Sequence, residues 1–139
     1  MANDEEITRY MTLIEQYKEQ MSQLEMQSQY VSAAIADYNK AKITVEQMSN
    51  SEPGTEVILP IGGSTFINAT TKDTSNVLFD IGGGIVIEKK SEDAVNKIDK
   101  RIEDLQKTQE KLMQMIQNIQ TETTEIYSKA QKLMEKQKS

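Results

Sequence analysis

Residues 77–87 decide the fold, and they read Val77-Leu78-Phe79-Asp80-Ile81-Gly82-Gly83-Gly84-Ile85-Val86-Ile87. Two runs rich in β-branched and aromatic residues flank three glycines. Such runs favour strands, and glycine readily adopts the positive φ angles of a tight hairpin turn. The stretch therefore predicts a β-hairpin. A further hairpin is predicted just before it, from Val57-Ile58-Leu59-Pro60-Ile61, Gly62-Gly63-Ser64 and Thr65-Phe66-Ile67.

Outward from the hairpins, apolar residues recur at heptad spacing in both flanking stretches. Before the hairpins, the a and d positions are Ile7, Tyr10, Ile14, Tyr17, Met21, Leu24, Ser28, Val31, Ile35, Tyr38, Lys42 and Val45. After them, the a and d positions are Val95, Ile98, Ile102, Leu105, Gln109, Leu112, Ile116, Ile119, Thr123, Ile126, Ala130, Leu133 and Gln137. Sustained heptads predict two long helices that bury a narrow seam against each other.

The predicted fold class is mainly α with a small β portion. Its parts are an N-terminal helix in 1–50, two hairpins in 51–90 and a C-terminal helix in 91–139. Pro53-Gly54 is expected to follow the end of the first helix, and Ser91 to cap the second. Helices of similar length favour an antiparallel coiled coil, which would bring Ser28 near Met113. A parallel dimer of straight chains is the competing topology.

The composition of the chain narrows the range of possible functions. The chain has no cysteine and no histidine, so thiolate and imidazole ligands and the usual general base are missing. No metal, cofactor or enzymatic activity is predicted. No run approaches the roughly 20 apolar residues of a membrane helix, and the polar start does not resemble a signal peptide, so a cytoplasmic location is predicted. A net charge of −6 without a basic stripe argues against nucleic acid.

The hairpins carry apolar residues on both faces. A two-stranded hairpin is marginal in water, and its open edges favour pairing with other chains. We therefore predict an obligate oligomer in which other subunits bury the hairpins. Pro60 cannot donate a ladder hydrogen bond, so it is expected at an edge or a bulge. The expected oligomerisation residues are Val57, Ile58, Leu59, Ile61, Phe66, Ile67, Val77, Leu78, Phe79, Ile81, Ile85, Val86 and Ile87.

The helix ends near the two termini hold more apolar residues than a two-helix seam requires. Met11 and Leu13 occupy e and g positions, and Tyr127 and Met134 occupy e positions. Spacing alone leaves open whether they thicken the seam or form a binding surface. Met113 and Met115 are interpreted as local packing. The candidate tip residues are Ile7, Tyr10, Met11, Leu13, Ile14, Ile126, Tyr127, Leu133 and Met134.

The order helix, two hairpins, helix resembles the α-type subunit of prefoldin, with archaeal members the most similar in character. The resemblance is carried by Val57 to Phe66 and by Asp73 to Lys89. It implies an ATP-independent chaperone, or holdase. Two α-type and four β-type subunits would join through their hairpins into a β-barrel, hold unfolded proteins at the coiled-coil tips and deliver them to a group II chaperonin. The alternative is a structural coiled-coil scaffold with specific docking tips.

Overall fold

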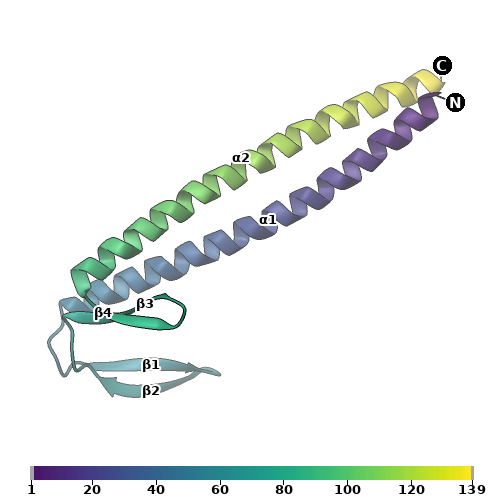
Figure 1. Cartoon of the computed structure of the whole chain (residues 1–139). Coiled ribbons are helices and arrows are strands. Elements are labelled where there is room, and N and C mark those ends of the chain that lie inside the picture. The colour runs from purple at the N-terminus through teal and green to yellow at the C-terminus, as the bar shows by residue number, and fades with distance from the viewer. Residues whose placement is uncertain (1, 139) are drawn as a thin grey trace. The chain divides into compact units, whose positions relative to one another are not determined.

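The computed structural model describes residues 2–138 (Figure 1). In chain order the elements are α1 (Ala2–Ser49), β1 (Glu56–Gly62), β2 (Thr65–Thr70), β3 (Asn76–Gly82), β4 (Ile85–Lys90) and α2 (Ser91–Lys138). The predicted fold class, two long helices with two small hairpins between them, is confirmed. The chain divides into two compact units. Unit 1 is Met1–Ala34 with Leu105–Ser139, and unit 2 is Ile35–Asp104.

The two helices run without interruption because neither contains glycine or proline. Each has 48 residues, which corresponds to roughly 72 Å of helix. At the end of α1, side chains bond the last carbonyls, which lack partners within a helix. Ser49 Oγ donates to the Glu46 carbonyl at 2.8 Å, and Ser51 Oγ donates to the Gln47 carbonyl at 2.9 Å. Pro53 and Gly54 then prevent continuation.

In unit 1 the two helix segments are antiparallel. Gln137 Nε2 donates to Asp4 Oδ1 at 2.6 Å, and Gln109 Nε2 donates to Ser28 Oγ at 3.0 Å. A hydrogen bond with Glu122 raises the pKa of the Tyr17 phenol. Along these contacts, the residue number in α2 falls as the residue number in α1 rises. The core of this unit is made by Ile14, Leu24, Leu112 and Ala130.

The heptad prediction holds closely for burial. Every predicted a and d position from 7 to 45 is buried or half-buried, as is every one from 95 to 133. The predicted alignment of α1 with α2 differs from the observed one by about one helical turn at Ser28. Ser28 bonds Gln109, four residues before the expected Met113.

A polar layer interrupts the apolar seam of unit 1. Gln109 Nε2 donates to Ser32 Oγ at 2.8 Å as well as to the hydroxyl and, at 3.3 Å, the carbonyl of Ser28. Gln109 Oε1 is buried without a hydrogen-bond partner. A polar residue at an a position lowers stability but selects one register, because displaced registers leave it unpaired. We infer that this layer fixes the antiparallel alignment.

We expect Gln109→Leu to raise the stability of the helix pair by about 1 kcal/mol, because it removes a buried unpaired oxygen. The register should become less well defined. Thermal unfolding measures the first effect, and disulfide trapping between engineered cysteines in adjacent registers measures the second. Gln106→Leu, at an exposed position of the same helix, is the control. A lower melting temperature with an unchanged trapping pattern would contradict the prediction.

The helix segments of unit 2 pack on Ala94, Ile98 and Ile102, which are the buried apolar residues there. An ion pair lies beside them. Lys42 Nζ is 2.7 Å from Asp99 Oδ1, and this hydrogen bond raises the pKa of Lys42. Because Lys42 occupies an a position, the carboxylate gives its ammonium a partner at the edge of the seam.

Both hairpins have the same construction. Each is a separate two-stranded antiparallel sheet. In β1–β2, Pro60 pairs with Phe66 and Gly62 with Thr65, so Ile61 is an extra, bulged residue. Gly63 and Ser64 form the turn, both with φ of 57°, as a type I′ turn requires. The predicted position of Pro60 next to a bulge is confirmed.

Hairpin β3–β4 repeats this construction. Asp80 pairs with Val86 and Gly82 with Ile85, which leaves Ile81 bulged. Gly83 and Gly84 form the turn at φ of 63° and 77°. Asp80 Oδ1 accepts a 2.8 Å hydrogen bond from the Gly82 amide. This bond supports the bulge at the place that Pro60 occupies in the first hairpin.

The link between the hairpins is ordered by polar contacts. Asp73 accepts hydrogen bonds from the side chain of Asn76 and from the amides of Ser75 and Asn76. These bonds lower the pKa of the Asp73 carboxyl, the Asn76 side chain contributing most. Ser91, expected to cap α2, instead binds the link. Its amide donates to the Ser75 carbonyl at 2.9 Å, and its hydroxyl donates to the Thr74 carbonyl at 3.4 Å.

Candidate interaction surfaces

The hairpins expose an unusual amount of apolar surface. Of the thirteen residues predicted for oligomerisation, four are half-buried: Val57, Val77, Phe79 and Ile87. The other nine are exposed: Ile58, Leu59, Ile61, Phe66, Ile67, Leu78, Ile81, Ile85 and Val86. Contiguous apolar surface of this kind marks interaction sites in soluble proteins.

Hairpin β3–β4 has one face against the helices of unit 2. Two cations lie near the Phe79 ring, with Lys97 Nζ at 5.3 Å and Arg101 Cζ at 5.5 Å from its centroid. Arg101 Nη1 also donates to the Tyr38 hydroxyl at 2.8 Å. The cation–π contacts therefore hold β3 to α2, and the hydrogen bond joins α2 to α1. The opposite face is open, and Leu78 there is 76% exposed.

Hairpin β1–β2 has little apolar burial. Only Val57 and Ala69 are half-buried among its strand residues, and the side chains around its turn are exposed. Hydrogen bonds between the residues that flank its two strands close its base. The Gly54 amide donates to the Thr71 carbonyl at 2.7 Å, and the Thr55 amide donates to Thr71 Oγ1 at 3.0 Å. The hairpin thus lacks the apolar support that Phe79 gives its neighbour.

The candidate tip residues fall into two groups at the terminal end of unit 1. Met11, Tyr127 and Met134 are exposed. The others are covered to differing degrees by the helix pair: Ile7, Tyr10, Leu13, Ile126 and Leu133 are half-buried, and Ile14 is only 4% exposed. Another protein can reach the three exposed residues, here called the terminal surface, without separating the helices.

The sequence interpretation of Met113 and Met115 was wrong. Both are exposed, as are Met26 and Tyr30 on α1. The e and g positions that they occupy flank the seam without entering it. The cluster of Lys97, Arg101 and Tyr38 around Phe79 was also missed. Its only signal in the sequence was the single aromatic residue of β3.

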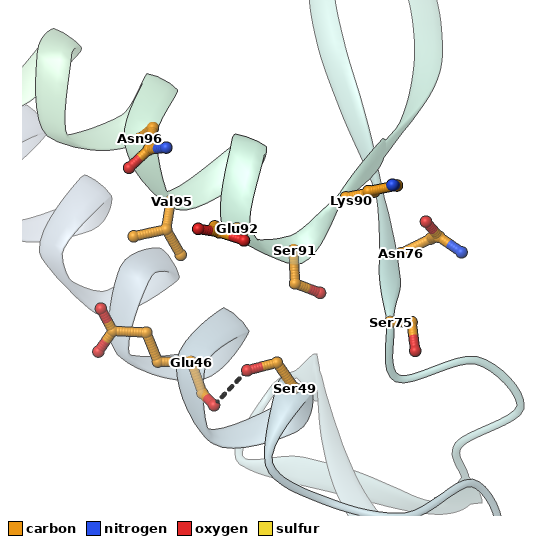
Figure 2. A pocket seen from close by; sticks show the side chains of 9 residues that line it. All are labelled: Glu46, Ser49, Ser75, Asn76, Lys90, Ser91, Glu92, Val95 and Asn96. Atoms are coloured by element: carbon orange, nitrogen blue, oxygen red, sulfur yellow. Dashed lines mark hydrogen bonds between the residues drawn. The ribbon is translucent and has the colours of Figure 1, made fainter.

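Unit 2 contains an open crevice of about 610 Å³ where the end of α1, the start of β3 and the start of α2 meet. Figure 2 shows its polar side chains, including Glu46, Lys90 and Glu92, spread apart around it. The hydrogen bond drawn there joins Ser49 to the Glu46 carbonyl. This spread brings no nucleophile, base and orienting group together as catalysis requires. Within residues 2–138, no cluster of acidic residues could hold a metal ion.

Within residues 2–138, no helix is both long enough and apolar enough to cross a membrane.

Paired helices that carry two hairpins with uncovered apolar faces define a subunit of a larger assembly. The prefoldin subunit family profile matches residues 17–136. The chain therefore belongs to the prefoldin family, which is a family of chaperone subunits that assemble into oligomers.

Several relatives support the assignment. Prefoldin subunit alpha of Archaeoglobus fulgidus is 23% identical over 126 residues, covering 91% of this chain and 92% of the relative. The counterpart from Methanoregula boonei is 34% identical over 82 residues, or 59% of this chain and 53% of the relative. Prefoldin subunit 5 of Pongo abelii is 29% identical over 103 residues, or 69% and 67%.

The fold has a match among solved structures. A cryo-EM structure of filamentous PFD from Methanocaldococcus jannaschii superposes with a TM-score of 0.60 at 20% identity, over 91% of this chain and 98% of that one.

Proposed function

We propose that this chain is the α-type subunit of an ATP-independent holdase. The observation that carries the proposal is the distribution of exposed large apolar side chains. Apart from Ile43, those of residues 2–138 lie on the hairpins or on the helices of unit 1. One group suits permanent burial between subunits, and the other suits reversible contact with a client.

The hairpins are proposed to join partner subunits. Two α-type and four β-type chains would pair their hairpins into a closed β-barrel, which removes exposed edges. Nine exposed apolar hairpin residues would become its interior and its contacts. This accounts for hairpins that are marginal by themselves.

The terminal surface is proposed to hold unfolded proteins. Methionine is flexible and polarisable, so it adapts to many apolar partners. Tyrosine adds a large apolar face with a polar end. Such contacts need no nucleotide and no catalytic chemistry, and the client would then pass to a group II chaperonin in the cytoplasm.

The test uses the chain co-expressed with a β-type subunit and follows the light scattering of a chemically denatured client without nucleotide. The triple variant Met11→Glu, Tyr127→Glu, Met134→Glu should need about tenfold more complex for the same protection, because charges replace apolar contacts. Native mass should be unchanged.

Thr12→Glu, Ser128→Glu, Gln131→Glu is the matched control, since it adds the same charge at exposed positions of the same end. If both triple variants lose client protection equally, the effect is one of general charge, and the terminal surface does not bind clients. Tight binding of one partner without protection of denatured clients would overturn the holdase and favour the scaffold.

A further inference from the structure

Exposed methionines are confined to one part of the molecule. Of the seven methionines in residues 2–138, five are exposed, and all five belong to unit 1: Met11, Met26, Met113, Met115 and Met134. Their exposed fractions lie between 49% and 59%. Met21 and Met48 are half-buried. The sulfur atoms that solvent reaches most easily are therefore on the helix pair that carries the terminal surface.

The assembly surfaces contain no methionine. None occurs between Met48 and Met113 in the sequence, so β1–β4 and the start of α2 lack thioethers. The buried apolar residues of both units are isoleucine, leucine and alanine. An oxidant that modifies exposed methionines would thus act on unit 1 without changing the hairpins or the buried seam.

Thioethers are also the only oxidisable sulfur in the chain, because it has no cysteine. Peroxides oxidise methionine to its sulfoxide. The sulfur lone pair attacks one oxygen of hydrogen peroxide, an S–O bond forms and the O–O bond breaks. Sulfur loses two electrons, and the peroxide is reduced to water after proton transfer. The product carries a strong hydrogen-bond acceptor where an apolar side chain was.

We propose that the five exposed methionines are an oxidative modification site through which peroxide weakens the holding of unfolded chains and leaves assembly intact. The inference rests on the proposed holdase function. A sulfoxide oxygen that contacts an apolar client segment loses its water without gaining a donor, which opposes binding. Methionines on one solvent-facing helix pair make this loss cumulative, because an extended client can contact several of them.

The experiment treats the purified chain with hydrogen peroxide, removes the oxidant and combines the chain with untreated β-type subunits. Peptide mass spectrometry should find the five exposed methionines oxidised before Met21 and Met48. The complex concentration for half-maximal protection of a denatured client should rise about tenfold, since polar sulfoxides disrupt methionine-rich interfaces. Native mass and helix content should stay the same.

The matched variant replaces the five methionines by leucine, which conserves volume and helix propensity and is not oxidised by peroxide. Each protein is compared with its own untreated sample, so differences in client protection before oxidation do not affect the comparison. If oxidation reduces client protection by the natural chain and does not reduce it for the variant, the inference is supported. Undiminished protection by the oxidised natural chain, equal loss in the variant, or faster oxidation of Met21 and Met48 overturns it. An untreated complex that protects no client overturns the proposed function itself.

Discussion

Leu78→Lys is expected to prevent assembly with partner subunits while the chain itself stays folded. Leu78 is on the open face of β3 and is 76% exposed in the single chain. Its cross-strand partner is Glu88, so a lysine there gains an opposite charge directly across the hairpin. The hairpin should therefore tolerate the change. In the proposed barrel, the ammonium would be desolvated within an apolar contact.

Burying that charge should raise the dissociation constant of the assembly at least about 100-fold, which corresponds to roughly 3 kcal/mol. Native mass spectrometry over a dilution series measures the effect. Tyr30→Lys is the matched control, because Tyr30 is 72% exposed and lies on α1 outside the proposed barrel. If Leu78→Lys assembles as tightly as the control, the open face of β3–β4 is not an assembly surface.

Phe79→Ala is expected to release hairpin β3–β4 from the helices of unit 2. The substitution removes the ring that Lys97 and Arg101 contact. A buried Phe→Ala change costs about 3–5 kcal/mol, and we expect roughly half of that for a half-buried ring whose cation–π contacts are also lost. The open face would then no longer be presented in a fixed orientation, so assembly should weaken as well.

Hydrogen exchange of the β3 and β4 amides measures the release, and the expected result is about tenfold to 100-fold faster exchange. Two further variants separate the contributions. Phe79→Tyr keeps the ring and should behave like the natural chain. Arg101→Gln removes one cation while leaving Lys97 in place, so it should give an intermediate effect. Unchanged exchange in Phe79→Ala would show that the hairpin is held by its strand connections alone.

The helices and hairpins were predictable because their signals are local. A heptad stripe reports which side of a helix meets its partner, and burial of the a and d positions follows it from Ile7 to Val45. Glycines at both turns report positive φ angles. These features depend on neighbours a few residues apart, so the sequence displays them directly.

The surfaces were harder to predict because they depend on tertiary contacts. Arg101 occupies a g position, where a charge normally indicates a solvated face. Only tertiary packing gives it partners, with Phe79 coming from β3 and Tyr38 from α1. Within the tip set, Ile14 and Met11 are both apolar, yet the seam covers one and leaves the other open. Apolar character alone could not separate them.

The shared construction of the hairpins has a consequence for how such a chain can arise. Val57, Ile61, Gly62, Gly63 and Ile67 recur unchanged 20 residues later, and the strand pairing repeats with the same bulge. A tandem duplication of 20 residues would therefore convert a one-hairpin ancestor into a two-hairpin chain in a single step. Each copy would carry its own turn and bulge, and later substitutions, such as phenylalanine at position 79 against leucine at position 59, would make the two hairpins differ.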